Sequence, residues 1–341
     1  MADKKKNAGQ KAGKGAKLAA ALLLIAVSAG LLLYAFKTQK DADSKIEGAG
    51  TADHAVVEQT ALTHDGKNYP LKNHISTLLV MGTDTYADTH DDDDGLELYY
   101  NYVQSDFMTV LVFDDDAKTC TPLQLNRETM CNVDRLSVNG KVRDQIFCQL
   151  TLAHTYGTGK EDSCVNVRNA VSRLLCDAPI ENYIAFTMDA IPAITDMVGG
   201  VQVTLEDDLT DIDPSFVKGN TVTLTSANAE RFVRTRSMTR LEGNVERMGR
   251  HRQYLRGFTE AARNAAEQDS GFTLKSYDEL SPYITTDLSA TNISEYSKKL
   301  GEYEILDIIT PEGELRMGER YAEFYPDEDD VWSKVKSLWC R

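Results

Sequence analysis

The sequence has little positive charge for its size. Its 341 residues carry 37 Lys and Arg against 53 Asp and Glu, a formal net charge of -16. Because a polyanion is attracted by surplus positive charge, the chain as a whole is a poor candidate for nonspecific binding of nucleic acid. Its length indicates one large domain or two modest ones, and its apolar fraction of 42% is that of a globular protein.

The sequence also lacks the patterns of two common kinds of site. No CxxC pair or Cys/His cluster indicates zinc, and the six His are scattered. No pairing of Ser or Cys with His indicates an activated nucleophile, so a covalent enzyme intermediate is not required. We interpret His154, in the segment LAHTY, as a core or edge residue of a helix rather than a catalyst.

One long apolar run stands near the N-terminus. Residues 18–36 contain no charged side chain and are enough for a helix to cross a bilayer. Residues 1–17 hold six Lys and one Asp, a net charge of +5, so the positive-inside rule predicts a cytoplasmic tail, a transmembrane helix and export of the rest. A cleaved signal peptide is the alternative, although its apolar core is usually about 7 to 15 residues. Polar residues 37–57 are predicted to be a linker, and 58–341 an extracellular domain.

All six cysteines follow the apolar run, in a compartment where disulfides persist. Six cysteines allow 15 pairings. We predict only the pair Cys131 and Cys148, because they flank a probable hairpin around Asn139-Gly140, a strong turn signal. Free buried thiols are the alternative.

Short β-branched runs alternate with amphipathic segments over the rest of the chain. The runs predicted to be strands are Ser76–Met81, Phe107–Phe113, Thr121–Leu125, Asn182–Thr187, Val201–Leu205 and Ile305–Ile309. Between them, residues 167–175 carry one apolar helical stripe, and Ile191–Val198 precede two glycines that would stop a helix. This order predicts an α/β fold: a three-layer α-β-α sandwich with a mixed central sheet, preceded by the one transmembrane helix.

Carboxylates are predicted at two strand ends. Asp84 follows the first strand, and Asp106 immediately precedes the second. Two carboxylates that meet at a sheet edge would bind Mg²⁺ and bring a phosphorylated substrate into reach. We expect both to be exposed, and the alternative is that both are ordinary turn residues. Arg127, after the strand that ends at Leu125, places a guanidinium beside them.

A cluster of arginines inverts the acidic balance of the chain. Eight lie within 26 residues: Arg231, Arg234, Arg236, Arg240, Arg247, Arg250, Arg252 and Arg256. The planar fork of arginine suits bidentate recognition of phosphate. Arg234 and Arg236 alternate as on an extended chain and would project to one side, whereas Arg247 and Arg250 would share a helix face. The alternative is a solvated helix face paired with the acidic surroundings.

Seven segments in this order resemble the LytR-CpsA-Psr family of Gram-positive cell-wall glycopolymer ligases: LLVMGTDT, QSDFMTVLVF, LQLNRETM, QLTLAHTYG, VGGVQVTL, FVRTR and ERMGRHRQYL. The resemblance covers about Ile75 to Phe258. It implies a short cytoplasmic tail, one membrane helix and an extracellular α-β-α domain. It also implies an apolar channel for a polyprenyl chain, arginines around the carrier's pyrophosphate, and a Mg²⁺ ion that two Asp hold.

The resemblance assigns roles residue by residue. Asp84 and Asp106 stand where the metal-binding Asp of the family stand. The residues at pyrophosphate-binding positions are Arg127, Arg234, Arg236, Arg247, Arg250, Gln104 and Gln149, and those with implied catalytic roles are Arg127, Asp106 and Arg236. The chain departs from the family pattern at Gln104 (Arg), Gln149 (Lys), Asn244 (Asp) and Glu128 (Asp). Each replacement keeps a hydrogen-bonding side chain, which favours a divergent branch over a dead enzyme. Arg240, Arg252 and Arg256 match no family position, and we expect them to tolerate substitution.

The function that the resemblance implies is a Mg²⁺-dependent phosphotransferase anchored in the membrane. It would attach a glycopolymer from a polyprenyl-pyrophosphate carrier to peptidoglycan, by direct attack of a hydroxyl on phosphorus. Two alternatives stay open: a polyprenyl pyrophosphatase, and a non-catalytic protein that binds lipid or wall polymer. Nucleic acid is not an expected partner. The acidic run Asp91–Asp94 is interpreted as a solvated loop, because the spacing of a calcium-binding EF-hand is absent.

Overall fold

The computed structural model of the protein describes residues 59–85, 100–137, 140–237, 240–269, 272, 276 and 279–341. The predicted tail, transmembrane helix and linker, and the acidic run Asp91–Asp94, lie outside these residues. Among the helices of the described part, none combines the length and the apolar character that a membrane span requires.

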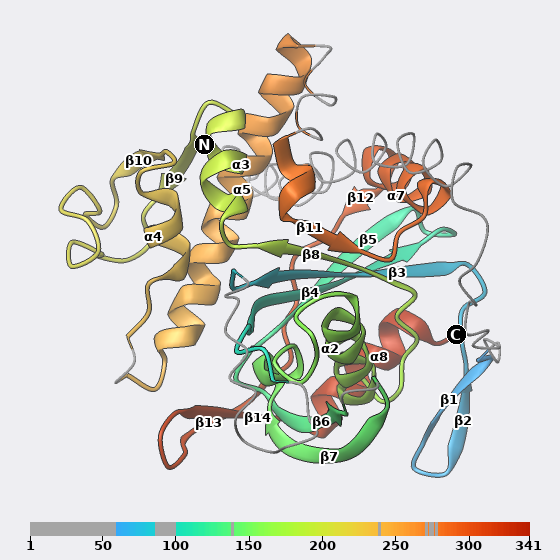
Figure 1. The fold of residues 1–341 in the computed structure, drawn as a ribbon. Coiled ribbons are helices and arrows are strands. Elements are labelled where there is room, and N and C mark those ends of the chain that lie inside the picture. Colours follow the sequence, from blue (N-terminus) through green and yellow to red (C-terminus); the bar gives the residue numbers. More distant parts are fainter. Residues whose placement is uncertain are drawn as a thin grey trace, which may run out of the picture.

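A six-stranded mixed sheet forms the centre of the molecule (Figure 1), with the strand order β11-β8-β3-β4-β5-β12. The strands are β3 (Ile75–Thr83), β4 (Ser105–Asp114), β5 (Thr119–Leu125), β8 (Asn182–Thr187), β11 (Ile284–Thr286) and β12 (Glu304–Ile305). Strand β3 runs antiparallel to β4 and parallel to β8, which confirms the predicted mixed sheet. The first four predicted strands match β3, β4, β5 and β8, whereas the predicted strand Ile305–Ile309 is reduced to the short β12.

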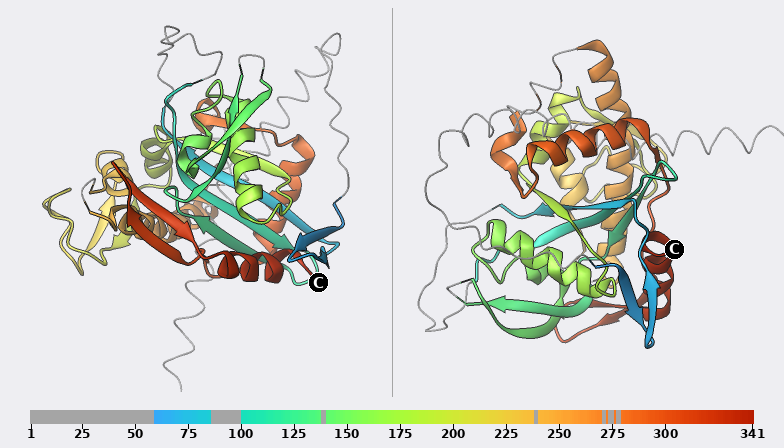
Figure 2. Two further views of the ribbon diagram at one scale, coloured as in Figure 1. Left: turned by 90° about the horizontal axis from the view of Figure 1, so that it is seen from below. Right: turned by 90° about the vertical axis from the view of Figure 1, so that its right-hand side faces the viewer.

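Helices cover both faces of this sheet. Helices α2 (Glu161–Leu174) and α8 (Glu328–Trp339) pack on one face and α7 (Ala290–Glu302) on the other, as two views show (Figures 1 and 2). Side chains alternate along β3, so Leu79 and Met81 join the core under α2 and α8, whereas Leu78 and Val80 join the core under α7. Burial on both faces explains the continuous apolar run in β3, and it gives the α-β-α layering that the sequence predicts.

A separate lobe holds the longest helix against the sheet edge. It contains α3 (Ala190–Met197), β9 (Val201–Thr204), β10 (Thr221–Leu224), α4 (Ala229–Arg234) and α5 (Gly243–Gln268), which share one apolar core. The predicted strand Val201–Leu205 is β9, but it pairs with β10 outside the central sheet. A Cβ atom on Gly257 of α5 would collide with the carbonyl oxygen of Gln202 in β9, so glycine permits this close packing.

Two local signals fix helix ends, and the first of them is the glycine stop that the sequence predicts. Gly199 and Gly200 follow α3 with φ angles of 75° and 95°, a left-handed conformation that glycine adopts readily. Their N–H groups donate to carbonyls in the last turn of α3, which ends the helix. At the other end of the chain, the carboxylate of Asp327 accepts from the N–H groups of Asp329 and Asp330 and begins α8.

Three further antiparallel ribbons complete the structure: β1 (Ala61–His64) with β2 (Lys67–Pro70), β6 (Met130–Leu136) with β7 (Val142–Gln149), and β13 (Gly313–Met317) with β14 (Ala322–Pro326). Short 3₁₀ turns lie at Leu150–Ala153 (η2) and Ser281–Tyr283 (η3). Ribbon β6–β7 is the predicted hairpin, and its register places Cys131 directly opposite Cys148. The predicted disulfide between Cys131 and Cys148 is not formed: all six cysteines are free thiols. Burial raises the pKa of Cys131 to about 12, which disfavours the thiolate that disulfide formation requires.

Candidate active site

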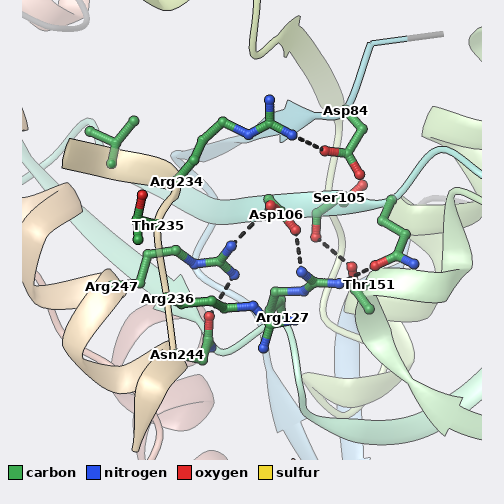
Figure 3. Close-up of polar contacts among 12 residues, drawn as sticks. Asp84, Ser105, Asp106, Arg127, Thr151, Arg234, Thr235, Arg236, Asn244 and Arg247 are labelled. Carbon is green, nitrogen blue, oxygen red and sulfur yellow. Dashed lines mark hydrogen bonds and ion pairs between the residues drawn. The ribbon is translucent and has the colours of Figure 1, made fainter. Parts of the chain in front are cut away.

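Two neighbouring antiparallel strands bring the predicted carboxylates to one edge of the sheet. Strand β3 ends at Thr83, which faces Ser105 at the beginning of β4. Asp84 therefore lies beside Asp106, and its N–H donates to the carbonyl oxygen of Gln104 at 3.0 Å. Figure 3 shows the two carboxylates with the arginines that surround them. The sequence prediction that Asp84 and Asp106 meet at a strand end is thus what the structure shows.

Asp106 is held between two buried arginines. Its Oδ1 pairs with Arg127, and its Oδ2 accepts from Nη1 of Arg247 at 2.9 Å. Burial alone would raise the pKa of Asp106, but Arg127 and Arg247 outweigh burial and hold that pKa below its ordinary value. The Asp106 side chain is 8% exposed, so the expectation of an exposed carboxylate is wrong here. The reason is tertiary: α5 lies over the strand end and covers Asp106 with Arg247.

Asp84 has a more open environment. Its side chain is 31% exposed, and its Oδ1 accepts from Nη2 of Arg234 at 3.0 Å. Burial raises the pKa of Asp84, and repulsion from Asp106 raises it further, against the effect of Arg234. Arg234 also donates to Glu230 at 2.8 Å, one turn earlier in α4. Arg234 is the last residue of that helix, so the prediction that it lies on an extended chain is wrong.

A second ion pair adjoins the first. Arg236 donates to Oε1 of the buried Glu128 at 2.8 Å. Burial raises the pKa of Glu128 above its ordinary value, although Arg236 and Arg127 act to lower it. Arg236 is also close enough to Arg127 to lower its pKa, after the larger effect of burial. The cationic groups Arg127, Arg236 and Arg247 are therefore crowded together, a natural setting for an anion.

Two predicted phosphate ligands do not join this group. Arg250 is buried and donates from Nε to the carbonyl oxygen of Phe232 at 2.7 Å and from Nη2 to that of Thr235. Gln149 donates to the carbonyl oxygen of Ala322 at 2.6 Å, toward β14. Both side chains are committed to backbone carbonyls, so the structure gives them positioning roles: Arg250 anchors the segment that carries Arg234 and Arg236.

An apolar cavity of about 130 Å³ opens next to the charged group. It lies between the sheet edge, α3 and α5, and aromatic rings of Phe107, Phe186, Tyr254 and Phe258 form part of its wall. His251 also lines it and follows Arg247 by one helical turn. Burial lowers the pKa of His251 to about 3, so the ring is neutral, and its Nε2 lies 2.9 Å from the carbonyl oxygen of Val233. His251 was not predicted as a site residue, because its only signal in the sequence is its place one turn after Arg247.

A model of the LytR_cpsA_psr family matches residues 33–334 of the chain. The protein belongs to the LytR-CpsA-Psr family. The "Polyisoprenyl-teichoic acid--peptidoglycan teichoic acid transferase TagU" of Bacillus cereus (strain AH820) is 27% identical to it over 186 residues, 54% of this chain and 52% of that protein. The chain thus spans about half the length of the curated relative it matches.

Solved structures share the fold. TagV of B. subtilis superposes with a TM-score of 0.55 at 20% identity, over 78% of this chain and 96% of that chain. A structure of TagT bound to LI-WTA gives a TM-score of 0.57 at 17% identity, over 83% of this chain and 96% of that chain. At these identities the likeness concerns the fold, and it confirms the predicted α/β fold with a mixed central sheet.

Three of the four residues that depart from the LytR-CpsA-Psr pattern, Gln104, Asn244 and Glu128, take part in the site. Asn244 accepts from Nη2 of Arg247 at 2.6 Å and donates to Asn126 at 2.7 Å. Gln104 accepts from Nη2 of Arg127. Each of these two neutral side chains therefore orients an arginine that also contacts Asp106. The hydrogen-bond network around Asp106 is continuous at both positions.

Polar atoms with no hydrogen-bond partner are concentrated around this LytR-CpsA-Psr site. Among the described residues, Ser105 Oγ, Arg127 Nε, Arg247 Nε and Glu128 Oε2 are buried and lack one. Buried polar atoms without a partner are rare in native proteins, so their concentration here makes this region a candidate binding site. Ser105 was not predicted as a site residue, and its sequence signal is only its place before Asp106.

The donor set fits Mg²⁺ bound together with a substrate. Asp84 and Asp106 are close enough that each charge disfavours the other, which a cation would relieve. In the described part of the chain, no three His, Cys, Asp or Glu side chains form a metal cluster. Magnesium is commonly bound by one or two carboxylates, with waters and substrate phosphates as the remaining ligands, so two Asp are sufficient.

Proposed function

We propose that the protein is a Mg²⁺-dependent phosphotransferase that moves a glycopolymer from a polyprenyl-pyrophosphate carrier to peptidoglycan. One observation carries the proposal: arginines from three separate parts of the chain surround two carboxylates at the edge of an apolar cavity. A lipid-linked diphosphate has the matching arrangement, an anionic centre beside an apolar tail. The name of the B. cereus relative, a polyisoprenyl-teichoic acid transferase, supports the same substrate class.

The apolar cavity suits the prenyl chain. Its wall contains aromatic and aliphatic side chains from β3, β4, α3 and α5, and its charged neighbour is Arg247. Burying apolar surface contributes roughly 25 cal/mol per Å², so a prenyl segment in this cavity would add affinity without contacting the reacting phosphorus.

The arginines suit the diphosphate. Burial lowers the pKa of Arg247 to about 10, so the guanidinium remains charged at neutral pH even in a covered position. We propose that Arg127, Arg236 and Arg247 bind the phosphoryl oxygens and stabilise the charge that spreads over them in the transition state. Mg²⁺, when bound at Asp84 and Asp106, would supply further charge neutralisation. The nearby nitrogens without a partner are oriented by ion pairs already in place, which limits reorganisation during the reaction.

The reaction that we propose is a direct displacement. A hydroxyl oxygen of peptidoglycan forms a bond to the sugar-proximal phosphorus, and the bond from that phosphorus to the bridging oxygen breaks. The prenyl phosphate leaves with the bonding electron pair, and the hydroxyl proton passes to this departing phosphate or to solvent. Asp106 is a poor general base, because two arginines hold its pKa low. Its proposed roles are instead to orient Arg127 and Arg247 and, with Asp84, to hold Mg²⁺ when the ion is bound. Positioning and electrostatic stabilisation would supply most of the rate enhancement.

We further propose that residues 18–36 anchor the protein as a single membrane span and that the domain lies outside the cell, as the basic residues 1–17 indicate. A protease added to intact cells should then digest the chain after Phe36 and spare an N-terminal tag. Protection of the C-terminus would contradict the proposed orientation.

The central experiment uses a labelled lipid-linked glycopolymer, soluble peptidoglycan oligomers and the full chain, with and without Mg²⁺. Transfer of label to peptidoglycan that stops when a chelator removes the metal supports the proposal. Release of free phosphorylated glycan without transfer would instead identify a pyrophosphatase, and retention of intact donor would identify a binding protein. The variant R127K provides the test of the site, since it keeps the charge but loses the fork.

A further inference from the structure

Tyrosine rings form an exposed cluster next to the charged site. Tyr100 and Tyr102 are 45% and 54% exposed, and their ring centroids lie 4.5 Å apart at an angle of 86°. Tyr156, which follows η2, lies with its ring centroid 5.8 Å from that of Tyr100. Large aromatic side chains that gather on a surface commonly mark a binding site.

The backbone holds this cluster in place. Between the two exposed rings, Asn101 is buried, and its Nδ2 donates to the carbonyl oxygens of His154 at 2.8 Å and Gly157 at 2.7 Å. Its Oδ1 accepts from the N–H of Val103 at 2.8 Å. Tyr102 has a φ angle of 60°, a left-handed conformation that costs energy for a residue with a Cβ. Such strain persists where the surroundings enforce it and is commonest at functional sites.

The tyrosine cluster and the apolar cavity lie on opposite sides of the charged site around Asp106. Arg247 pairs with Asp106 on the side of α5, where His251 lines the cavity. Arg127 pairs with Asp106 on the other side and donates to Gln104, two residues after Tyr102. Figure 3 shows Arg247 and Arg127 on opposite sides of Asp106. The order is therefore cavity, charged site, tyrosine cluster.

We infer that the tyrosine cluster, Tyr100 and Tyr102 with Tyr156, binds the glycan chain of the peptidoglycan acceptor. The inference rests on the proposed function. In a phosphoryl transfer the attacking and leaving oxygens lie roughly in line across the phosphorus. If the prenyl phosphate leaves toward the cavity, the acceptor hydroxyl approaches from the opposite side of the charged site. The tyrosine cluster lies on that side.

The chemistry of the cluster fits a sugar. One face of a pyranose ring carries C–H groups with partial positive charge, which pack against the negative face of an aromatic ring, while the phenol hydroxyl can bond to a sugar hydroxyl. Tyrosine offers this contact area with few rotatable bonds to immobilise. A stable protein partner would need about 800 Å² on each side, far more than two exposed rings provide. An anionic membrane surface would be repelled by a chain with a net charge of -16.

The test compares three variants of the full chain. The double variant Y100A/Y102A removes the exposed rings, Y100F/Y102F keeps the rings without the hydroxyls, and Y321A removes an equally exposed tyrosine, 56% exposed, from the ribbon β13–β14. Transfer rates are measured against the concentration of soluble peptidoglycan oligomer and, separately, of lipid-linked donor. We expect Y100A/Y102A to raise the KM for the oligomer about tenfold and to leave the KM for the donor unchanged. Y100F/Y102F should regain most of the loss, and Y321A should match the wild type.

Direct binding of the oligomer, measured by calorimetry without donor, separates this inference from the proposed function. Wild-type binding that Y100A/Y102A abolishes supports the inference even if no transfer is observed, in which case only the proposed reaction fails. Transfer with an unchanged oligomer KM in Y100A/Y102A overturns the inference and leaves the reaction standing. A rise in donor KM alone would place the donor glycan there instead and overturn it. A fall in the Tm of Y100A/Y102A large enough to unfold the protein at the assay temperature would show that the rings stabilise the fold, and it would overturn the inference.

Discussion

The two carboxylates of the site lie at the same sheet edge but in contrasting regions. Asp106 belongs to an inner region, where Arg127 and Arg247 cover it and hold its pKa low. Asp84 belongs to a rim, where burial and the charge of Asp106 raise its pKa in spite of Arg234. Burial by itself therefore does not determine whether an acidic group is charged. Asp106 forms ion pairs with two arginines, whereas Asp84 pairs with Arg234 and is repelled by the charge of Asp106.

The largest expected effect on the free energy of unfolding comes from a substitution in the inner region, at Asp106. The substitution D106A leaves two buried guanidiniums without their shared partner and should lower the free energy of unfolding by about 3 to 5 kcal/mol. D84A removes a partly exposed pair and should lower it by at most about 1 kcal/mol. Urea unfolding of both variants measures the difference. Equal losses would show that the two regions do not differ as the structure indicates.

Of the two substitutions, we therefore expect only D84A to leave the fold intact. Activity provides a second readout, because both variants should lose Mg²⁺-dependent transfer. A fully active D84A would remove Asp84 from the proposed metal site while leaving the inner region unchanged.

His154 extends this comparison to a base, because burial lowers its pKa in spite of the nearby Asp162. Burial lowers the pKa of His154 to about 4 from about 6.5 in the unfolded chain. Between these values the unfolded chain binds a proton that the folded chain does not, so the free energy of unfolding falls as the pH falls from 6.5 toward 4. This group should account for a loss of about 3 kcal/mol.

The measurement is urea unfolding at several pH values. H154Q should flatten the pH dependence in this range, whereas H74Q, which changes an exposed histidine, should keep the wild-type dependence. An unchanged slope in H154Q would mean that other groups cause the acid sensitivity. Burial keeps the His154 ring neutral at neutral pH, whereas two arginines keep the buried Asp106 charged.

The rim should matter for turnover more than for stability. R234A removes a guanidinium that pairs with Asp84 and Glu230 at a partly exposed position, so unfolding should change by at most about 1 kcal/mol. If Arg234 also binds the diphosphate, its loss should cost about 1.5 to 3 kcal/mol of transition-state stabilisation, at least about tenfold in kcat/KM. A transfer assay at subsaturating donor measures this. Wild-type kcat/KM in R234A would confine the phosphate site to the inner region.

The strand ends that carry the site were predictable because their signals are local. The apolar run Leu78–Met81 must be buried on both faces, and the polar residues that begin at Asp84 cannot continue it, so the carboxylate falls at the edge. Asp106 and Arg127 follow by the same logic on β4 and β5. The local excess of positive charge singled out the arginines near α5. The resemblance assigned them to the pyrophosphate, because no local period connects them to the sheet.

Burial and partner choice were not predictable, because both depend on contacts across long stretches of chain. Spacing on a helix gives Arg247 and Arg250 one face, but the packing of α4 against α5 turns Arg250 to the carbonyls of Phe232 and Thr235. Gln149 contacts Ala322, 173 residues away, because β14 lies beside the end of β7. No pattern within a short window contains this information.

The smallest expected effects separate the outer arginines from each other. Arg240 is 61% exposed and pairs with Glu246, and Arg256 is 56% exposed and pairs with Glu206, so R240A and R256A should change stability and transfer very little. Arg252 is half-buried and donates to the buried Gln124 at 2.8 Å. R252A leaves that acceptor without its partner and should cost about 1 to 3 kcal/mol of stability. All three arginines were predicted from the sequence to tolerate substitution. Urea unfolding of the three variants tests whether Arg252 instead stabilises the fold through its hydrogen bond to Gln124. A loss in R252A no larger than that in R240A would return it to the exposed group.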